Sequence, residues 1–229
     1  MTCARTGGSG AVDKLQIPCS RAGTGSTLSE FVRLLARLPR RRARVGLLGG
    51  SFNPAHDGHR HISHLALRRL GLDRVWWLVS PQNPLKGKVG MASLEARLLH
   101  ARSIAGSSRI DASDLERQIN TIYTVDTVRY LTRTLPHIRF VWLMGADNLA
   151  EVAEWRRWPL LFESLPIAIF DRPTYARKAL ISQAVRFFSR SRLSSRAATR
   201  LACSKSPAWV FIHAQLHPES GTRLRRHEM

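Results

Sequence analysis

The fold of this chain is decided by the stretch Gly49-Gly50-Ser51-Phe52-Asn53-Pro54-Ala55-His56-Asp57-Gly58-His59. It follows an apolar run that begins at Arg44, and such a run is typical of a buried strand that feeds a tight turn. Residues 59–70 come next, and their apolar side chains recur at helical spacing. The two glycines let backbone N–H groups approach an anion closely, and Asn53-Pro54 fixes a turn. The stretch therefore predicts a strand, a phosphate-accepting loop and a helix in succession.

Similar short apolar runs recur along the chain. We expect further strands at 75–79, 140–145, 165–170 and 209–213, and further helices at 94–105 and 123–134. The runs do not alternate apolar with polar residues, which favours a parallel sheet covered on both faces. The pattern predicts an α/β fold in a single domain. In such sheets the ligand lies at the carboxyl ends of the strands, where the unusual residues of this chain gather.

His56 and His59 are the first candidates for chemistry. They flank Gly58 at the start of the predicted helix, whose N-terminal amides favour phosphate. Two imidazoles on a phosphate chain would neutralise charge on its oxygens, which is what phosphoryl and adenylyl transfer require. A metal site is the alternative, but the stretch lacks a carboxylate or cysteine at the usual spacing. A second alternative is that the two histidines only cap the helix.

These residues resemble a known motif. Gly-Gly-Ser-Phe-Asn-Pro-x-His-x-Gly-His is the form of the first motif of the HxGH-type nucleotidyltransferase superfamily that bacterial nicotinate-nucleotide adenylyltransferases use. The resemblance continues in order from about Arg44 to Arg225, through Pro81-Gln82-Asn83-Pro84-Leu85-Lys86, Tyr123-Thr124-Val125-Asp126-Thr127, Gly145-Ala146-Asp147-Asn148-Leu149, Trp155, Trp158 and Asp171-Arg172-Pro173. It implies a Rossmann-like doubly wound parallel sheet with helices on both faces. The implied activity is adenylyl transfer from ATP to nicotinate mononucleotide, with release of pyrophosphate, in NAD biosynthesis.

The resemblance also implies residue roles. His56 and His59 would be catalytic, because they would bind the ATP phosphates and stabilise the charge of the leaving pyrophosphate. Asp147 would accept a hydrogen bond from a ribose hydroxyl, and the other ATP-binding residues would be Gly49, Gly50, Ser51, Phe52, Gly145, Ser220, Thr222 and Arg225. The mononucleotide would contact Asn53, Lys86, Thr124, Trp155 and the backbone amide of Arg156. Mg²⁺ would arrive bound to ATP, and no protein ligand set for a metal is expected.

Purely structural roles remain possible for several of these residues. Trp155 and Trp158 are spaced as core aromatics on one helix face would be, Asp147 follows a strand as a helix cap would, and Lys86 suits a solvated loop.

The C-terminal region departs from the family pattern Ser-Ser-Thr-x-x-Arg. The chain reads Ser220-Gly221-Thr222-Arg223-Leu224-Arg225, so a glycine replaces one serine and removes a hydroxyl donor. The family continues for another helix, whereas this chain ends at Met229. We therefore expect a shortened C-terminal end and less certain placement of Arg225.

The first residues differ in composition from the rest. Residues 1–27 are rich in Gly, Ser, Thr and Ala and carry few large apolar side chains that could offset the entropy of ordering. Residues 28–38 show helical spacing. We expect a flexible basic extension over 1–43, with one short helix, and a nucleotidyltransferase domain over 44–229. The helix could dock on the domain, or it could serve targeting or lie on a membrane surface.

Charge and cysteine content bound the partners. The formal net charge is +20, so the chain attracts polyanions of every kind. A non-catalytic nucleic-acid-binding protein is the rival from another class, with Arg186–Arg200 as its contact segment; the alternative for that segment is a solvated helix face. Three scattered cysteines favour a reducing, cytoplasmic setting, and no apolar run is long enough to cross a bilayer.

Several alternatives stay open within the enzyme reading. A phosphopantetheine adenylyltransferase shares the fold and reaction type, but it carries Thr in place of His56. A preference for nicotinamide over nicotinate mononucleotide depends on whether the site offers donors to a carboxylate. We expect no specific nucleic-acid partner, and a homo-oligomer remains open.

Overall fold

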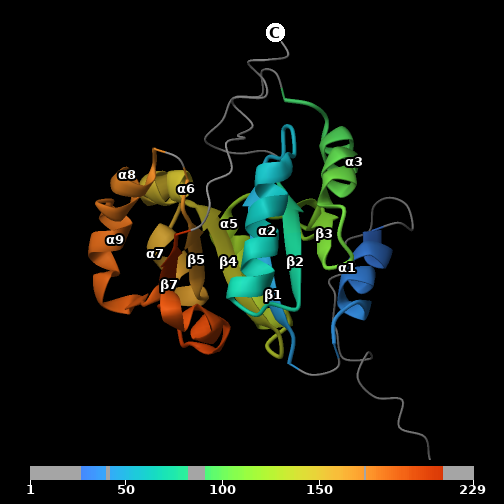
Figure 1. Cartoon of the computed structure of the whole chain (residues 1–229). Coiled ribbons are helices and arrows are strands. Elements are labelled where there is room, and N and C mark those ends of the chain that lie inside the picture. Colours follow the sequence, from blue (N-terminus) through green and yellow to red (C-terminus); the bar gives the residue numbers. More distant parts are fainter. Residues whose placement is uncertain (1–26, 40–41, 82–90, 173, 214–229) are drawn as a thin grey trace, which may run out of the picture.

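The computed structural model describes residues 27–39, 42–81, 91–172 and 174–213. Within them a parallel sheet has the strand order β3-β2-β1-β4-β5-β7-β6 (Figure 1). The strands are β1 (Arg44–Gly50), β2 (Arg74–Val79), β3 (Ile110–Ser113), β4 (Arg139–Gly145), β5 (Ile167–Phe170), β6 (Arg192–Leu193) and β7 (Trp209–Ile212). The helices are α1 (Thr27–Ala36), α2 (Asp57–Arg69), α3 (Leu94–Ala105), α4 (Leu115–Gln118), α5 (Thr124–Thr134), α6 (Ala146–Glu151), α7 (Trp158–Ser164), α8 (Ala176–Leu180) and α9 (Gln183–Phe187), with short 3-10 turns η1 (Val152–Glu154), η2 (Ser189–Ser191) and η3 (Ser195–Cys203).

The strand order reverses at the centre of the sheet, between β1 and β4, and again at one edge, where β7 lies between β5 and β6. Strands β1, β2 and β3 follow one another toward one edge, and β4 then pairs with the other side of β1. This is the doubly wound arrangement that the resemblance implies. Ligands of such sheets bind where the order reverses, outside the carboxyl ends of the strands.

Helices cover both faces of the sheet (Figure 1). One apolar core lies under α2, α3 and η3 and includes Trp77 and Leu143, while the other lies under α1, α5 and α7 and includes Trp76 and Trp142. Adjacent residues such as Trp76 and Trp77 are both fully buried, because their side chains point to opposite faces of β2. The continuous apolar runs of the sequence therefore become strands buried on both sides.

The sequence analysis did not predict strands β3 and β6. Strand β3 contains Asp111 and Ser113, which break the apolar pattern, yet all of its residues are buried. Asp111 is tolerated there because Arg74 of β2 donates to its Oδ2 from Nε at 2.8 Å. Strand β6 spans only Arg192 and Leu193 and has no pattern to detect.

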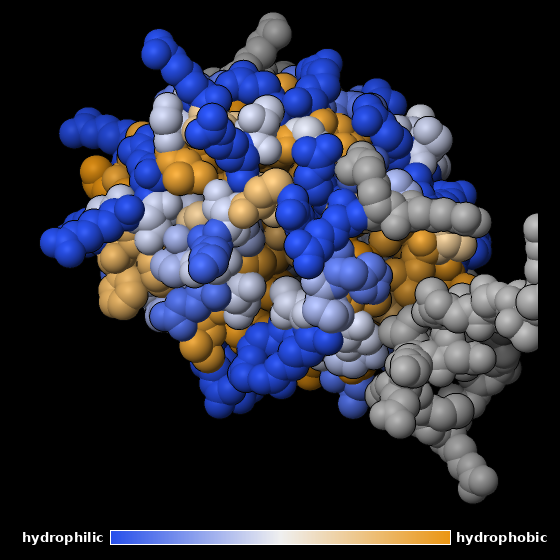
Figure 2. Space-filling view, turned by 90° about the horizontal axis from the view of Figure 1, so that it is seen from below, coloured by the Kyte–Doolittle hydropathy of each residue, from blue (hydrophilic) through white to orange (hydrophobic). Residues whose placement is uncertain are grey.

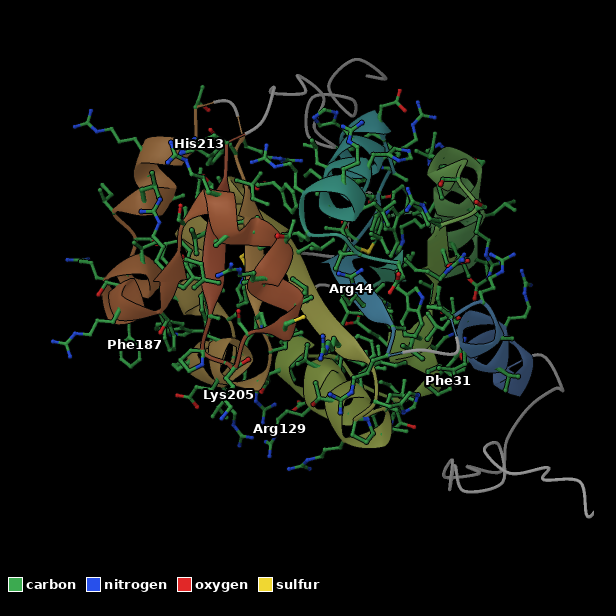
Figure 3. All side chains as sticks on the ribbon, turned by 60° about the horizontal axis from the view of Figure 1, so that its bottom comes forward. Phe31, Arg44, Arg129, Phe187, Lys205 and His213 are labelled. Atoms are coloured by element: carbon green, nitrogen blue, oxygen red, sulfur yellow. The ribbon has the colours of Figure 1, made fainter. Side chains whose placement is uncertain are left out.

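Helix α1 docks on the domain, which was one of the readings left open. Phe31 (labelled in Figure 3) and Leu34 are buried in the same core as α5, and Arg37 forms an ion pair with Asp111. The basic extension predicted over 1–43 thus includes a helix that packs against the domain.

The segment Arg186–Arg200 is not one solvated helix, as its bland reading supposed. It is broken into the end of α9, η2, β6 and the start of η3. Its apolar residues divide between surface and core: Phe187 lies at the surface (Figure 3) and is 64% exposed, whereas Phe188 is buried against Phe162.

The face at the amino ends of the strands is largely hydrophilic, with small apolar areas between the polar side chains (Figure 2). A search of the described residues for helices able to span a membrane finds none of sufficient length and apolarity.

Candidate active site

A cavity of about 550 Å³ opens at the carboxyl ends of β1 and β4, where the strand order reverses. Its walls come from the β1–α2 loop, the start of α5 and the segment between β4 and α7. Most residues predicted from the sequence line it, namely Gly49, Gly50, Ser51, Phe52, Asn53, His56, His59, Thr124, Gly145, Asp147, Trp155 and Arg156. Lys86, Ser220, Thr222 and Arg225 lie outside the described residues.

The loop after β1 is held in an unusual backbone conformation. Phe52 has a φ of 46°, in the left-handed region that residues with side chains rarely adopt. Its buried ring stacks on Trp77 with ring centroids 5.1 Å apart and lies 4.6 Å from the His59 ring. Gly49 is required by packing, because a Cβ there would lie 2.5 Å from the Trp142 ring. The loop is therefore fixed by its surroundings.

His56 and His59 lie together at the start of α2, and their ring centroids are 3.9 Å apart. His56 is the N-cap residue, and its backbone N–H donates to Nδ1 of His59 at 3.3 Å. Because Nδ1 accepts this hydrogen bond, a neutral His59 carries its proton on Nε2. The histidines thus cap the helix, as the second alternative predicted, but both also line the cavity.

Burial lowers the pKa of His59 well below its ordinary value of 6.5, and the charges of His56 and Arg172 lower it further. His59 is therefore neutral near pH 7. A neutral ring with Nε2–H is a hydrogen-bond donor that keeps the same form over the physiological range, which suits a group that contacts phosphate oxygens.

Asp147, directly after β4, forms an ion pair with Arg172, which follows β5; Arg172 Nη1 lies 2.7 Å from Asp147 Oδ2. Both residues line the cavity. Within the described residues the buried Oδ1 of Asp147 has no hydrogen-bond partner. Gly145 is glycine because a Cβ there would clash with Asp147. Asp147 therefore has one oxygen fixed by Arg172 and one left for a ligand.

The opposite wall carries aromatic and basic side chains. The Arg156 guanidinium lies 4.4 Å from the centroid of the Tyr123 ring, beside Thr124 at the start of α5. Trp155 is half-buried and lines the cavity. Trp158 also reaches the cavity, but it packs mainly among Phe162, Phe187 and Phe188, as its core-aromatic reading held.

Three charged residues that line the cavity, Glu116, Glu154 and Arg172, were not assigned by sequence reasoning. Arg172 stood in a recognised motif but received no role. Glu116 had no signal at all, because it lies in the short helix after the missed strand β3. Its carboxyl is buried, lines the cavity and accepts from the Thr127 hydroxyl at 3.2 Å. Burial raises the pKa of Glu116 to about 7, against hydrogen bonds from Thr127 and Ser80 that lower it.

Comparisons with known proteins agree with this geometry. A family model described as cytidylyltransferase-like matches residues 47–227. The chain is 49% identical over 182 residues to a probable nicotinate-nucleotide adenylyltransferase of Parvibaculum lavamentivorans, covering 80% of this chain and 90% of that protein. The corresponding protein of Methylorubrum extorquens strain PA1 is 46% identical over 182 residues, covering 80% of this chain and 98% of its own.

A solved structure shares the fold. It is that of the nicotinic acid mononucleotide adenylyltransferase of Plasmodium falciparum complexed with NaAD, with a TM-score of 0.60, 16% identity, and coverage of 80% of this chain and 83% of that one. Since sequence identity of nearly one half extends over most of both chains, this chain belongs to the nicotinate-nucleotide adenylyltransferase family.

Proposed function

We propose that this protein transfers the adenylyl group of ATP to the phosphate of nicotinate mononucleotide, giving nicotinate adenine dinucleotide and pyrophosphate for NAD biosynthesis. One observation carries the proposal: a single cavity joins a helix N-terminus bearing two histidines to a wall formed by Thr124, Trp155 and Arg156. The first wall suits phosphates. The second suits a flat ring that bears a negative charge.

The chemical step is an in-line displacement at phosphorus. A phosphate oxygen of the mononucleotide forms a bond to the α-phosphorus of ATP, and the bond from that phosphorus to the bridging oxygen of pyrophosphate breaks. No protein nucleophile takes part. His59 donates from Nε2 to a phosphate oxygen on which negative charge increases, and the first turn of α2 adds its dipole.

Asp147 and Arg172 bind the ATP side of the cavity. The Asp147 oxygen that Arg172 does not occupy accepts from a ribose hydroxyl. Arg172 also places a fixed positive charge near His59, which supports binding of the polyphosphate. The same charge adds to burial and to His56 in lowering the pKa of His59, so it also helps to keep the ring neutral.

The other wall selects nicotinate over nicotinamide. The Thr124 hydroxyl and the Arg156 backbone amide are both hydrogen-bond donors. The two oxygens of a carboxylate can accept from both, whereas a carboxamide has only one oxygen and would turn its NH2 group toward the second donor. The Arg156 guanidinium, held over Tyr123, adds a positive charge near the same place. Trp155 stacks on the pyridine ring.

Mg²⁺ enters this scheme as part of the ATP substrate. A search of the described residues finds no group of three or more His, Cys, Asp or Glu side chains that could hold a metal ion. The proposal assigns the coordination to the triphosphate oxygens and water, because Mg²⁺ usually keeps several waters and binds substrate phosphates. Its contribution is to neutralise charge on the phosphates.

The test is pyrophosphate release from ATP and Mg²⁺ with three acceptors: nicotinate mononucleotide, nicotinamide mononucleotide and phosphopantetheine. We expect the highest kcat/KM with nicotinate mononucleotide. Equal turnover with the two pyridine nucleotides would refute the selective role of Thr124 and Arg156. Turnover with phosphopantetheine alone would refute the substrate assignment, and absence of turnover from folded protein would refute the function.

Two expectations about the protein's setting accompany the proposal. We place the reaction in the cytoplasm, because the three scattered cysteines of the chain suit a reducing compartment. A homo-oligomer remains a prediction, which sedimentation of the full chain would decide.

A further inference from the structure

Arg97 of α3 is a buried arginine that the proposed chemistry does not use. Its side chain donates four hydrogen bonds, and every acceptor is a backbone carbonyl oxygen: Ala92 at 3.0 Å, Ser51 at 2.6 Å, Ser80 at 2.8 Å and Pro81 at 3.2 Å. The residue is 3% exposed. Burial lowers its pKa, with the charge of Glu95 acting in the opposite direction, but a guanidinium stays protonated at neutral pH.

These carbonyls belong to three segments at the carboxyl edge of the sheet. Ser51 lies in the loop after β1, Ser80 and Pro81 follow β2, and Ala92 precedes α3. The segments also contact one another, because Ser80 donates from its backbone N–H to Gly50 at 2.9 Å. One side chain thus ties together the loops that follow two neighbouring strands.

The contact with Ser51 fixes the direction of a peptide group. The Ser51–Phe52 bond is trans, so its C=O and N–H point to opposite sides. The C=O points to Arg97, which does not line the cavity, whereas Ser51 and Phe52 do. The Phe52 N–H therefore points away from Arg97.

The same contact holds a strained residue. Phe52 has a positive φ, a conformation that persists only where the surroundings impose it. Trp77 and His59 hold its ring from one side. Arg97 holds the preceding carbonyl from the other, and Asn53 is fixed in turn through its Oδ1, which accepts from the Ala92 N–H at 3.2 Å.

We propose that Arg97 is a positioning residue for adenylyl transfer: by binding the carbonyls of Ser51, Ser80 and Pro81, it orients the amides of the phosphate-binding loop. This inference rests on the proposed function. Arg97 acts through the backbone and touches no substrate. A planar guanidinium suits the task because it presents several donors in fixed directions, whereas a lysine ammonium is a single compact charge.

A purely structural role would predict a different result, and the chain offers a matched control. Arg74 is a buried arginine at the amino end of β2, where it donates to Asp111 at 2.8 Å and to the backbone carbonyls of Arg37 and Ser108. It does not line the cavity. Replacing either arginine removes buried hydrogen bonds, but only Arg97 reaches the phosphate-binding loop.

The experiment compares Arg97→Met, Arg97→Lys and Arg74→Lys in the full chain, at a temperature at which circular dichroism shows each variant folded. Steady-state kinetics with ATP and nicotinate mononucleotide separate kcat from KM. We expect kcat of Arg97→Met to fall about 100-fold, which is the loss of rate that a small misplacement of catalytic groups can cause. The change in KM should be smaller. Arg97→Lys should recover part of the loss, and folded Arg74→Lys should match wild type.

A second measurement does not depend on turnover. Hydrogen exchange of the amides at 51–53 should quicken in Arg97→Lys and remain as in wild type in Arg74→Lys. If folded Arg97 variants kept wild-type kcat and loop exchange, the positioning role would be refuted while adenylyl transfer stood. If Arg97→Met failed to fold, Arg97→Lys alone would decide. An inactive wild-type protein would overturn the proposed function and this inference with it.

Discussion

The two ends of strand β2 use buried charge in opposite ways. At the amino end, Arg74 pairs with Asp111, which also pairs with Arg37 of α1. At the carboxyl end, Arg97 binds backbone carbonyls beside a cavity, and the buried Glu116 lines that cavity. At the amino end the charges pair with one another, whereas at the carboxyl end Arg97 binds only backbone carbonyls, next to the cavity.

The difference teaches how to separate structural from functional polar groups in this fold. Two residues that line the cavity at the carboxyl end have shifted pKa values, since burial lowers that of His59 and raises that of Glu116. Backbone strain is found there too, at Phe52. Perturbed titration and strain concentrate at functional sites because such states persist only where the surroundings enforce them. Mutations at the two ends should therefore damage different properties.

The largest effect on stability is expected at the amino end. Asp111→Ala leaves Arg74 buried without its carboxylate, and breaking a buried ion pair in this way costs about 3–5 kcal/mol. Urea denaturation should show this loss, together with a loosened α1. At a temperature at which the variant is folded, kcat should equal that of wild type. A parallel fall in kcat would show that the two ends of β2 are not independent.

The largest effect on catalysis is expected at His59. His59→Ala removes the Nε2 donor and should lower kcat about 10²–10³-fold, the range for loss of one donor that stabilises developing charge. His64→Ala is the matched control, since His64 lies on the same helix and does not line the cavity. Steady-state kinetics of both variants check this. Full turnover by His59→Ala would remove the phosphate role from this residue.

A third prediction concerns pH and Glu116. Its pKa is raised from 4.5 to about 7 in the folded protein, so the folded state holds the proton more tightly than the unfolded chain. Stability from this group is therefore complete below about pH 4.5, falls as pH rises toward 7, and stays low above that. The shift corresponds to about 3 kcal/mol.

Glu116→Gln tests this directly, because glutamine stays neutral and can still accept from Thr127. The free energy of unfolding should be measured at pH 5 and pH 8 for wild type and variant. We expect the wild type to lose more stability between these values than the variant does. Equal losses would mean that Glu116 titrates in its ordinary range.

The smallest effect is expected within the histidine motif itself. Asp57 lies between His56 and Gly58, yet its side chain is 45% exposed and pairs with Arg60 one helical turn on. Asp57→Asn should cost about 0.5 kcal/mol, as exposed pairs and helix-terminal charges do, and should leave kcat unchanged. Thermal melting and kinetics check both points. A large loss of activity would show that charge at this position matters to the bound phosphates.

Local patterns explain what the sequence could predict. Strand β1, the glycine loop and helix α2 are contiguous, so their residues carry the whole signal for a phosphate site. Helix α3 begins and ends at the residues expected, Leu94 and Ala105. The missed residues depend on distant partners. Because Asp111 is charged, strand β3 lacks the apolar pattern of a buried strand. Its contact with Arg74, from another strand, is what allows the Asp111 carboxylate to be buried.

Long-range contacts explain what the sequence could not predict. Arg97 lies 46 positions from Ser51 and Arg172 lies 25 positions from Asp147, and no spacing rule links such pairs. Glu116 reaches the cavity only because β3 lies beside β2 and ends at the same edge. In each case the sheet order decides which side chains meet.

The sequence by itself determined the α/β class, the phosphate-binding loop and the two histidines, because backbone propensity and motif chemistry act over neighbouring residues. Tertiary structure alone decided the protonation states of His59 and Glu116 and the joining of two walls into one cavity. It also decided that Arg74 pairs with Asp111 away from the cavity, whereas Arg97 binds the loop that lines it. Burial and proximity set these properties, and both arise only when distant segments pack together.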